Sequence, residues 1–229
     1  MFDIVFISYD EPNAEENWKD LVEKFPRAHR IHGVRGIHQA HLAAAEKAST
    51  DMFWVIDADA KLVDDFRFEY EVEDSFKDFV HVWRCKNPVN DLVYGYGGIK
   101  LLPRNLTLNM DISKPDMTTG ISTKFKPVKI LSNITVFNTD PFNAWKSGFR
   151  ECTKLSSKVI DRQKDGETEY RLDVWCTVGK SRPFGEYAIA GANKGRAYGI
   201  ENRDDKSKLK LINDFDWLKE QFETQHGSI

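Results

Sequence analysis

The chain of 229 residues is 41% hydrophobic and 12% aromatic, which suffices for a packed core and argues against wholesale disorder. Its net charge is −3, and its apolar runs are strand-length, well short of the roughly 20 residues that a membrane helix needs. The first ten residues carry an acid within their apolar run and no basic segment, so we expect no signal peptide. Three widely spaced cysteines argue against a disulfide framework or a zinc knuckle. These features predict a cytoplasmic protein with no membrane partner.

The small net charge conceals an uneven distribution along the chain. Residues 1–80 contain nine Lys and Arg against eighteen Asp and Glu, whereas residues 81–212 contain twenty-three against fourteen. Such charges are most often scattered over a solvated surface. The alternative is that the later part of the chain carries a surface for a polyanionic acceptor, with nucleic acid as one candidate.

The first sixty residues alternate between strand and helix signals. Five elements are predicted in order: a strand over residues 2–8, a helix over 14–25, a short strand over 28–31, a helix over 39–48 and a strand over 52–56. This order predicts an α/β fold, a mostly parallel sheet with right-handed crossovers and helices on its faces.

The pattern changes after residue 60. Strands are predicted over residues 79–84 and 129–136, with a glycine cluster between them; a helix runs from Pro141 to about Ile160, and another covers residues 215–225. Residues 172–178 are ambiguous between strand and helix, and residues 191–199 form a glycine-rich stretch. No segment has the composition of a linker, so we expect a single domain over residues 1–229.

An Asp-Ala-Asp sequence follows the apolar strand at residues 52–56. Asp57 and Asp59 lie at the carboxyl edge of the predicted sheet, where open α/β sheets bind ligands. Mg²⁺ or Mn²⁺ takes one or two carboxylates together with the phosphates of a substrate, so this pair predicts a divalent metal on a diphosphate. Because two aspartates one residue apart are common, an acidic surface turn is the alternative.

Residues 32–48 (HGVRGIHQAHLAAAEKA) lead directly into residues 52–60 (MFWVIDADA). This order resembles the family 2 glycosyltransferases and their relatives of the GT-A fold, in which a glycine-containing turn and a small-residue helix precede an apolar strand ending in an aspartate pair. The resemblance covers about the first hundred residues and includes residues 93–98 (VYGYGG), which are similar to the family's sugar-side loop. It implies a GT-A fold, Rossmann-like, with residues 1–100 as the nucleotide-sugar-binding half and residues 101–229 as the acceptor-side half.

The resemblance also implies roles for particular residues. The implied donor is a UDP-linked nucleotide-sugar, and its implied contacts come from Ser8, Tyr9, Asp10, Arg35, Asp57, Gly97 and Gly98. Asp57 faces the ribose or the metal, and Asp59 is the implied ligand of Mn²⁺ or Mg²⁺.

The acceptor hydroxyl must lose a proton, which a positioned carboxylate can take. Residues 148–151 (GFRE) resemble the segment in which inverting members place this base, so Glu151 is the catalytic candidate and Asp173 its reserve. The alternative for Glu151 is a helix-surface pair with Lys154 at i, i+3. Small GT-A-like enzymes that glycosylate hydroxymethylated bases in bacteriophage DNA are a related group, which would make DNA the acceptor and the host cytoplasm the location.

Other features admit other interpretations. Four histidines between residues 29 and 41 lack the acid or cysteine that would complete a zinc set, and late in the chain His226 stays unassigned. The stretch of residues 191–199, with Lys194 and Arg196, is a further candidate for a diphosphate or an acceptor phosphate. A haloacid dehalogenase-like phosphatase also uses an Asp-x-Asp sequence, although on its first strand and without a residue like Lys61 two positions later. A non-catalytic binding protein of the same fold is the third possibility.

Overall fold

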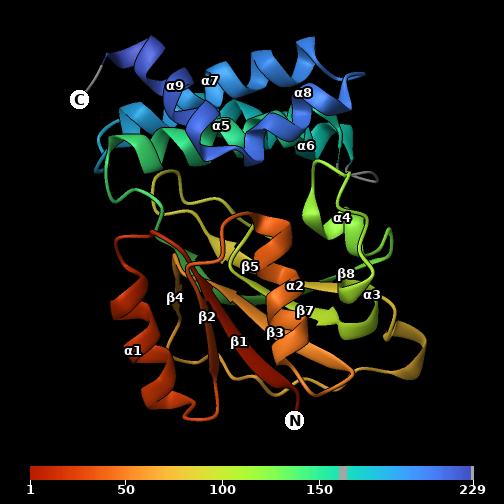
Figure 1. Cartoon of the computed structure of the whole chain (residues 1–229). Helices are drawn as coiled ribbons and strands as arrows, with labels where there is room; N and C mark the ends of the chain where they lie inside the picture. Colours follow the sequence, from red (N-terminus) through yellow and green to blue (C-terminus); the bar gives the residue numbers. More distant parts are fainter. Residues whose placement is uncertain (160–163, 228–229) are drawn as a thin grey trace. The chain divides into compact units, whose positions relative to one another are not determined.

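The computed structural model describes residues 1–159 and 164–227, and the chain forms two compact units. The sheet unit comprises Met1–Asn87, Val93–Ile112 and Met117–Val136, and the helical unit comprises Pro88–Leu92, Ser113–Asp116 and Phe137–Ile229 (Figure 1). The sequence predicts a division near residue 100, whereas the main boundary between the units falls between Val136 and Phe137. That both units act as one domain stays a prediction.

The sheet unit alternates strands and helices as expected from its first sixty residues. Its elements are β1 (Asp3–Ser8), α1 (Ala14–Lys24), β2 (His29–His32), α2 (Ile37–Lys47), β3 (Met52–Asp57), β4 (Ala60–Leu62), the 3₁₀ helix η1 (Asp74–Phe76), β5 (Val80–Lys86), β6 (Val93–Tyr94), β7 (Ile99–Pro103), α3 (Arg104–Leu108), α4 (Met117–Ile121) and β8 (Phe125–Thr135).

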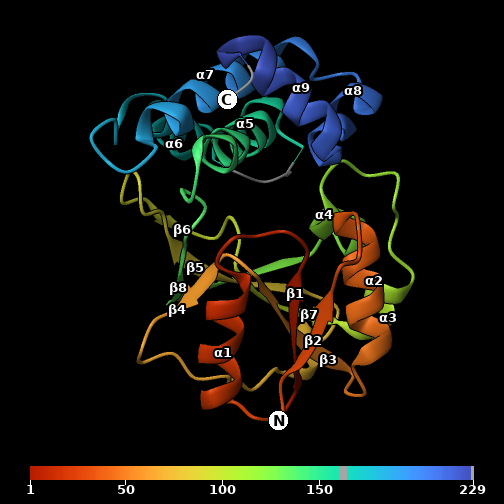
Figure 2. The same cartoon turned by 60° about the vertical axis from the view of Figure 1, so that its left-hand side comes forward.

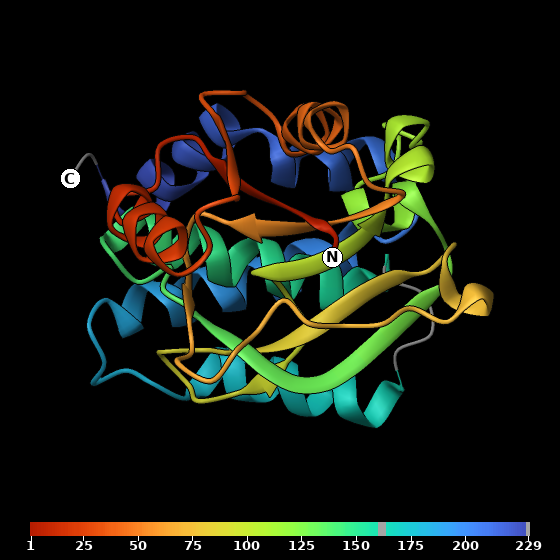
Figure 3. The same ribbon diagram turned by 90° about the horizontal axis from the view of Figure 1, so that it is seen from below.

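Within the described residues, the strands form one sheet in the order β2-β1-β3-β7-β5-β8-β4, with β6 paired to β5. β1 pairs in parallel with β2 and β3, and β5 pairs in parallel with β8. The pairings of β7 with β3 and β5, of β4 with β8 and of β6 with β5 are antiparallel. The α/β fold class is therefore confirmed, with a mixed sheet. Its long strand β8, between β5 and β4, curves across the view in Figure 3.

Each face of the sheet has its own apolar core. On the α1 side, Phe6 and Trp54 pack with Leu21 of α1 and Trp83 of β5. On the α2 side, Val5, Phe53 and Val55 pack with alanines of α2. Because successive side chains of a strand point to opposite faces, the uninterrupted apolar runs of β1 and β3 serve both cores at once. Figure 2 shows α1 and α2 on opposite sides of these strands.

The helical unit consists, where the structure describes it, of helices and their connections. They are α5 (Pro141–Ser157), α6 (Asp165–Thr177), α7 (Gly185–Glu201), α8 (Lys206–Lys210), the 3₁₀ helix η2 (Leu211–Asn213) and α9 (Phe215–His226). Pro141 occupies the first turn of α5, and the Asp140 carboxylate accepts a hydrogen bond from the Asn143 N–H, so this helix begins where the sequence predicts. It ends at Ser157; Ile160 lies outside the described residues.

The glycine-rich stretch of residues 191–199 lies inside α7, where it packs against α5. A Cβ on Gly191, Gly195 or Gly199 would collide with backbone atoms of Trp145, Phe149 or Thr153. Gly148 of α5 faces Ala188 of α7 in the same way. These glycines let two helix backbones approach closely, so here they serve the packing of α7 against α5. The ambiguous residues 172–178 belong mostly to α6.

The core of the helical unit is aromatic. Trp145 and Phe149 are fully buried and stack with ring centroids 4.9 Å apart, and Phe222 of α9 meets the Trp145 ring edge-on. Trp145 and Trp175 are therefore core side chains. Among the described residues, no helix combines the length and the apolar character needed to cross a bilayer.

Candidate functional site

Four segments that the sequence singles out meet at one edge of the sheet unit. β1, β2 and β3 end there at Ser8, His32 and Asp57, since the parallel register aligns Ser8 with His32 and Ile7 with Asp57. β7 begins at the same edge, because it runs antiparallel to β3 with Ile56 opposite Ile99. The edge therefore collects the residues that follow β1, β2 and β3 together with the glycine loop that precedes β7. We call it the carboxyl edge.

The Asp57 carboxylate is held in place by donors from β7 and the loop before it. Its Oδ2 accepts hydrogen bonds from the Gly98 N–H at 3.0 Å and from the Lys100 ammonium at 2.8 Å. Burial alone would raise the pKa of Asp57, but the charge of Lys100, the His41 side chain and these hydrogen bonds outweigh it and hold the pKa below its ordinary value. Asp57 is therefore ionised at neutral pH and paired with Lys100.

Lys100 is the residue of this edge that sequence reasoning misses. It lies 43 positions after Asp57, within a buried apolar strand, and its side chain is only 9% exposed. The strand register places Lys100 opposite Val55. Asp57 is two residues after Val55, so its side chain lies on the same face of the sheet as that of Lys100. A lysine inside an apolar strand is a usable signal, because such a residue is rarely buried without a partner.

The backbone of the Asp-Ala-Asp turn is fixed from both sides. The Ala58 carbonyl accepts a hydrogen bond from the buried Asn17 side chain of α1 at 2.8 Å. The Asp59 carbonyl accepts from the Val136 N–H at 2.7 Å. Asp59 itself is partly buried. The turn therefore presents its second carboxylate from a backbone that two other elements hold.

The residues after β1 and β2 divide between anchored and exposed side chains. Ser8 is buried, and its Oγ accepts from Arg30 at 3.0 Å and lies 3.0 Å from His32 Nδ1. Tyr9 and Asp10 are exposed in the connection to α1, and Arg35 is exposed just before α2. Ser8 is therefore a buried structural residue of the edge, whereas the side chains of Tyr9, Asp10 and Arg35 are accessible to a ligand.

The glycine loop before β7 shows why two of its glycines are placed as they are. Gly98 has a φ of +85°, which disfavours any residue with a Cβ, and a Cβ there would collide with the buried Asn133 side chain. Its backbone bonds Asp57 in both directions, since the Asp57 N–H also donates to the Gly98 carbonyl at 2.9 Å. Gly97 has open space around its Cα, so backbone here is accessible to a ligand.

His41 of α2 lies close enough to this pair to be affected by its charges. It is fully buried; burial and the charge of Lys100 lower its pKa to about 4, so its imidazole is neutral at physiological pH. Nδ1 is 2.8 Å from the Ile37 carbonyl, while Nε2 has no hydrogen-bond partner among the described residues.

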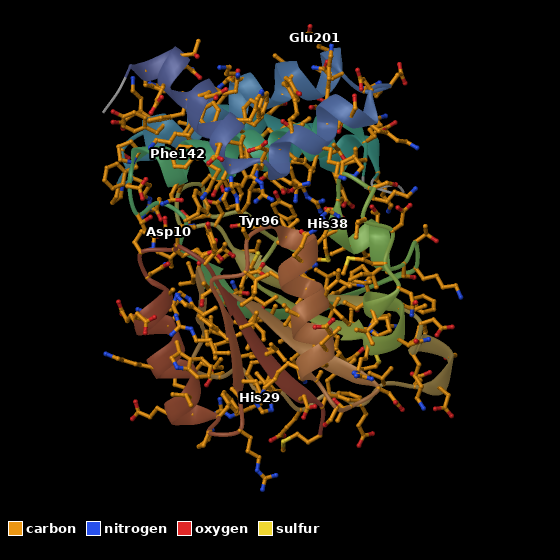
Figure 4. The ribbon with its side chains drawn as sticks, in the orientation of Figure 1. Asp10, His29, His38, Tyr96, Phe142 and Glu201 are labelled. Atoms are coloured by element: carbon orange, nitrogen blue, oxygen red, sulfur yellow. The ribbon has the colours of Figure 1, made fainter. Side chains whose placement is uncertain are left out.

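The early histidines do not form one cluster. Figure 4 shows His38 toward the end of the sheet unit that also carries Asp10 and Tyr96, whereas His29 lies toward the opposite end. Across the described residues, no group of three or more His, Cys, Asp or Glu side chains is arranged to hold a metal on its own. A divalent ion at the carboxyl edge would therefore need ligands from a bound molecule.

Glu151, the candidate base, lies on α5 of the helical unit. It is 6% exposed and forms an ion pair with Lys154 at 3.6 Å, while Lys154 also lies 3.8 Å from Asp116. The predicted i, i+3 pair with Lys154 is present, but Glu151 is buried, so its predicted place on the helix surface is wrong. A catalytic role for Glu151 stays a prediction.

The reserve candidate Asp173 is an exposed residue of α6. It accepts from Arg196 of α7 at 2.8 Å, and Arg196 also binds Glu169 at 2.7 Å. Lys194 donates to the Gln221 carbonyl at 2.9 Å. Both cations of the glycine-rich stretch therefore connect helices of one unit, which corrects their interpretation as a phosphate grip.

Sequence reasoning also misses a pair of thiols beside these residues. A hydrogen bond from Cys152 and the charge of Arg196 outweigh burial and lower the pKa of Cys176 to about 7. The pKa of Cys152 is raised, mainly because this thiol is completely buried.

Comparisons of the sequence with models of protein families and with curated proteins give no match.

Proposed function

We propose that the chain is a metal-dependent glycosyltransferase of the GT-A kind, which moves a sugar from a nucleoside-diphosphate donor, UDP-linked, to an acceptor hydroxyl. One observation carries the proposal: the donor-side residues implied by the sequence, from Ser8 to Gly98, meet at the carboxyl edge. The parallel register of β1 with β2 and β3 and the antiparallel register of β3 with β7 bring these residues together.

The edge suits a ligand with a nucleoside at one end and a diphosphate beside it. Open α/β sheets bind ligands at the carboxyl ends of their parallel strands. α2 begins at this edge, without acidic residues in its first turn, and Arg35 precedes it. The positive end of a helix and an arginine both favour a phosphate group. Tyr9 and Asp10 are then available to the base and ribose.

The donor set at the edge fits a divalent cation that arrives with the donor. Mg²⁺ and Mn²⁺ prefer oxygen ligands and commonly bind through one or two carboxylates plus substrate phosphates. Asp59 and Asp57 supply carboxylates at the end of β3, and no third protein ligand is arranged nearby in the described part of the chain. When bound, such an ion stabilises the negative charge that develops on the leaving diphosphate.

The acceptor side of the proposal rests on the helical unit. Glu151 is the proposed base and Asp173 its reserve, because the hydroxyl must transfer its proton to a carboxylate as the bond to the sugar forms. DNA with hydroxymethylated bases is the acceptor to test first, given the positive balance of residues 81–212, a range that includes parts of both units. A base in duplex DNA must leave the stack to be reached.

The experiment is a donor screen that measures release of UDP from UDP-sugars with Mn²⁺, in the presence and absence of hydroxymethylated DNA. We expect wild type to turn over a UDP-sugar and Asp59→Ala to lose about a hundredfold in rate or more, the usual scale for removing a group that stabilises transition-state charge. Asp64→Ala is the matched control, since this carboxylate follows the same strand region and is 99% exposed.

Two outcomes would contradict the proposal. If no UDP-sugar is consumed with Mn²⁺ or with Mg²⁺, the glycosyltransferase assignment fails. If the protein instead releases inorganic phosphate from phosphate esters in an Asp57-dependent manner, the Asp-Ala-Asp sequence serves a phosphatase of the haloacid dehalogenase kind.

A further inference from the structure

Two free thiols lie side by side in the helical unit. Cys152 belongs to α5 and Cys176 to the last turn of α6, and the Cys152 thiol donates a hydrogen bond to the Cys176 sulfur. α6 packs against both α5 and α7 within this unit (Figure 1). The fold therefore already brings together two sulfurs from neighbouring helices, which is the first requirement for an S–S bond.

The charges around the two sulfurs favour a thiolate on Cys176. The hydrogen bond from Cys152 and then the charge of Arg196, which also donates a hydrogen bond, lower the pKa of Cys176 to about 7. Asp173 opposes this effect, but its carboxylate is paired with Arg196 at 2.8 Å. Burial and the nearby Glu151 raise the pKa of Cys152. At neutral pH Cys176 is thus the nucleophile of the pair, and Cys152 is a protonated thiol.

The two thiols also differ in access to solvent. Cys176 is 8% exposed and lies one residue before the end of α6, next to the exposed Thr177 and Val178. Cys152 is completely buried. A small oxidant entering from solvent therefore meets Cys176 first, with Cys152 behind it. An accessible thiolate beside a second thiol is the usual arrangement of a reversible redox site.

We propose that Cys152 and Cys176 are a redox-active pair, in which hydrogen peroxide oxidises Cys176 and Cys152 then closes a disulfide between α5 and α6. The groups that carry this inference all belong to the helical unit. The inference therefore does not depend on the proposed function of the carboxyl edge.

The oxidation takes two steps. The Cys176 thiolate attacks one oxygen of hydrogen peroxide; an S–O bond forms, the O–O bond breaks, and hydroxide leaves, so sulfur loses the two electrons that the peroxide gains. The Cys152 sulfur then attacks the Cys176 sulfenic acid. The S–S bond forms as the S–O bond breaks, and the departing hydroxide takes the proton of the Cys152 thiol and leaves as water.

Cys85 provides an internal reference. It lies on β5 in the sheet unit, is completely buried, and its thiol donates to the Tyr94 carbonyl at 3.3 Å. We expect Cys85 to stay reduced under conditions that oxidise the pair, because a buried protonated thiol is a poor nucleophile.

The test treats the dilute, folded full chain with hydrogen peroxide at pH 7, then alkylates it in denaturant for intact-mass analysis and peptide mapping. We expect two of the three thiols to be lost, a cross-linked peptide that joins Cys152 to Cys176, and the return of both thiols with dithiothreitol. The control Cys85→Ser should form the same cross-link at a rate within about twofold of wild type.

Three variants separate the roles of the groups. Cys152→Ser should stop at a sulfenic acid on Cys176, which dimedone traps, whereas Cys176→Ser should leave Cys152 reduced. Arg196→Met should slow cross-linking about threefold at pH 7, because a smaller fraction of Cys176 is then thiolate, and the difference should narrow at pH 9.

The decisive outcomes come from wild type, so a variant that fails to fold does not affect them. The inference is overturned if peroxide leaves both thiols open to alkylation, or if it oxidises them without a cross-link. A cross-link that contains Cys85 as often as Cys152 would also overturn it, because the hydrogen-bonded pair would then have no preference.

Discussion

The chain contains two glycine-rich stretches with nearby cations, and they serve opposite purposes. Gly95–Gly98 precede β7 and Lys100, and their backbone bonds a carboxylate at an accessible edge of the sheet. Gly191–Gly199 lie within α7, where they face the backbone of α5 while Lys194 and Arg196 connect neighbouring helices. Composition alone does not separate the two stretches. The two stretches differ in what lies beside their glycines. Gly97 has open space beside its Cα, whereas Gly191, Gly195 and Gly199 contact the backbone of another helix.

The largest expected effect is at Gly195, where α7 packs closely against α5. Gly195→Ala places a Cβ against the Phe149 carbonyl, and two helix backbones cannot both stay in place. We expect a loss of about 3 kcal/mol in the free energy of unfolding, at the upper end for overpacking a core, measured by urea denaturation. The helical control Gly166→Ala, which has no atom within 4 Å of its added Cβ, should lose nothing and gain up to about 1 kcal/mol. Equal effects in the two variants would contradict the close-packing account.

At the carboxyl edge the corresponding change is Gly98→Ala. The positive φ and the Asn133 side chain both oppose it, so we expect a loss of about 1–2 kcal/mol. Nucleotide binding should weaken as well, because the Gly98 N–H positions Asp57. Thermal unfolding measures the stability and calorimetric titration measures the nucleotide affinity. In the control Gly97→Ala the added Cβ enters open space, so stability should stay unchanged. If Gly98→Ala is as stable as Gly97→Ala, the strained loop is not needed to hold Asp57.

The smallest expected effect concerns Arg196, in the glycine-rich stretch of α7. The pKa of Cys176 is lowered to about 7, so its thiolate forms above that pH and is lost as the pH falls below it. Because Arg196 stabilises the thiolate, Arg196→Met should raise this pKa, shifting the 240 nm absorbance titration to higher pH. Cys176→Ser identifies the signal by removing it. A titration that does not move would mean that Arg196 acts on the acids of α6 alone.

The sequence predicts much of the sheet unit and less of the helical unit, for physical reasons. β1, β3, α1 and α2 are recognisable because their apolar spacing matches a strand or a helix and their ends carry turn residues. α7 is not, because each glycine lowers intrinsic helix propensity by about 1 kcal/mol, and only packing against α5 restores the helix. Local composition cannot reveal that packing.

The same limit applies to the candidate site. Asp57 and Asp59 stand out as neighbours after an apolar strand. The partner of Asp57 does not, since Lys100 reaches it only through the antiparallel register of β3 with β7. A pairing between residues 43 positions apart depends on which strands become neighbours, which no spacing within either segment specifies.

The most direct test of the account is a calorimetric titration of UDP into wild type, with and without Mn²⁺, repeated with Asp59→Ala. We predict binding that Mn²⁺ strengthens in wild type and that loses its Mn²⁺ dependence in the variant, because Asp59 is a proposed ligand of the cation. If wild type binds neither UDP nor another common nucleoside diphosphate when Mn²⁺ is present, the carboxyl edge is not a nucleotide-sugar site and the central claim is contradicted.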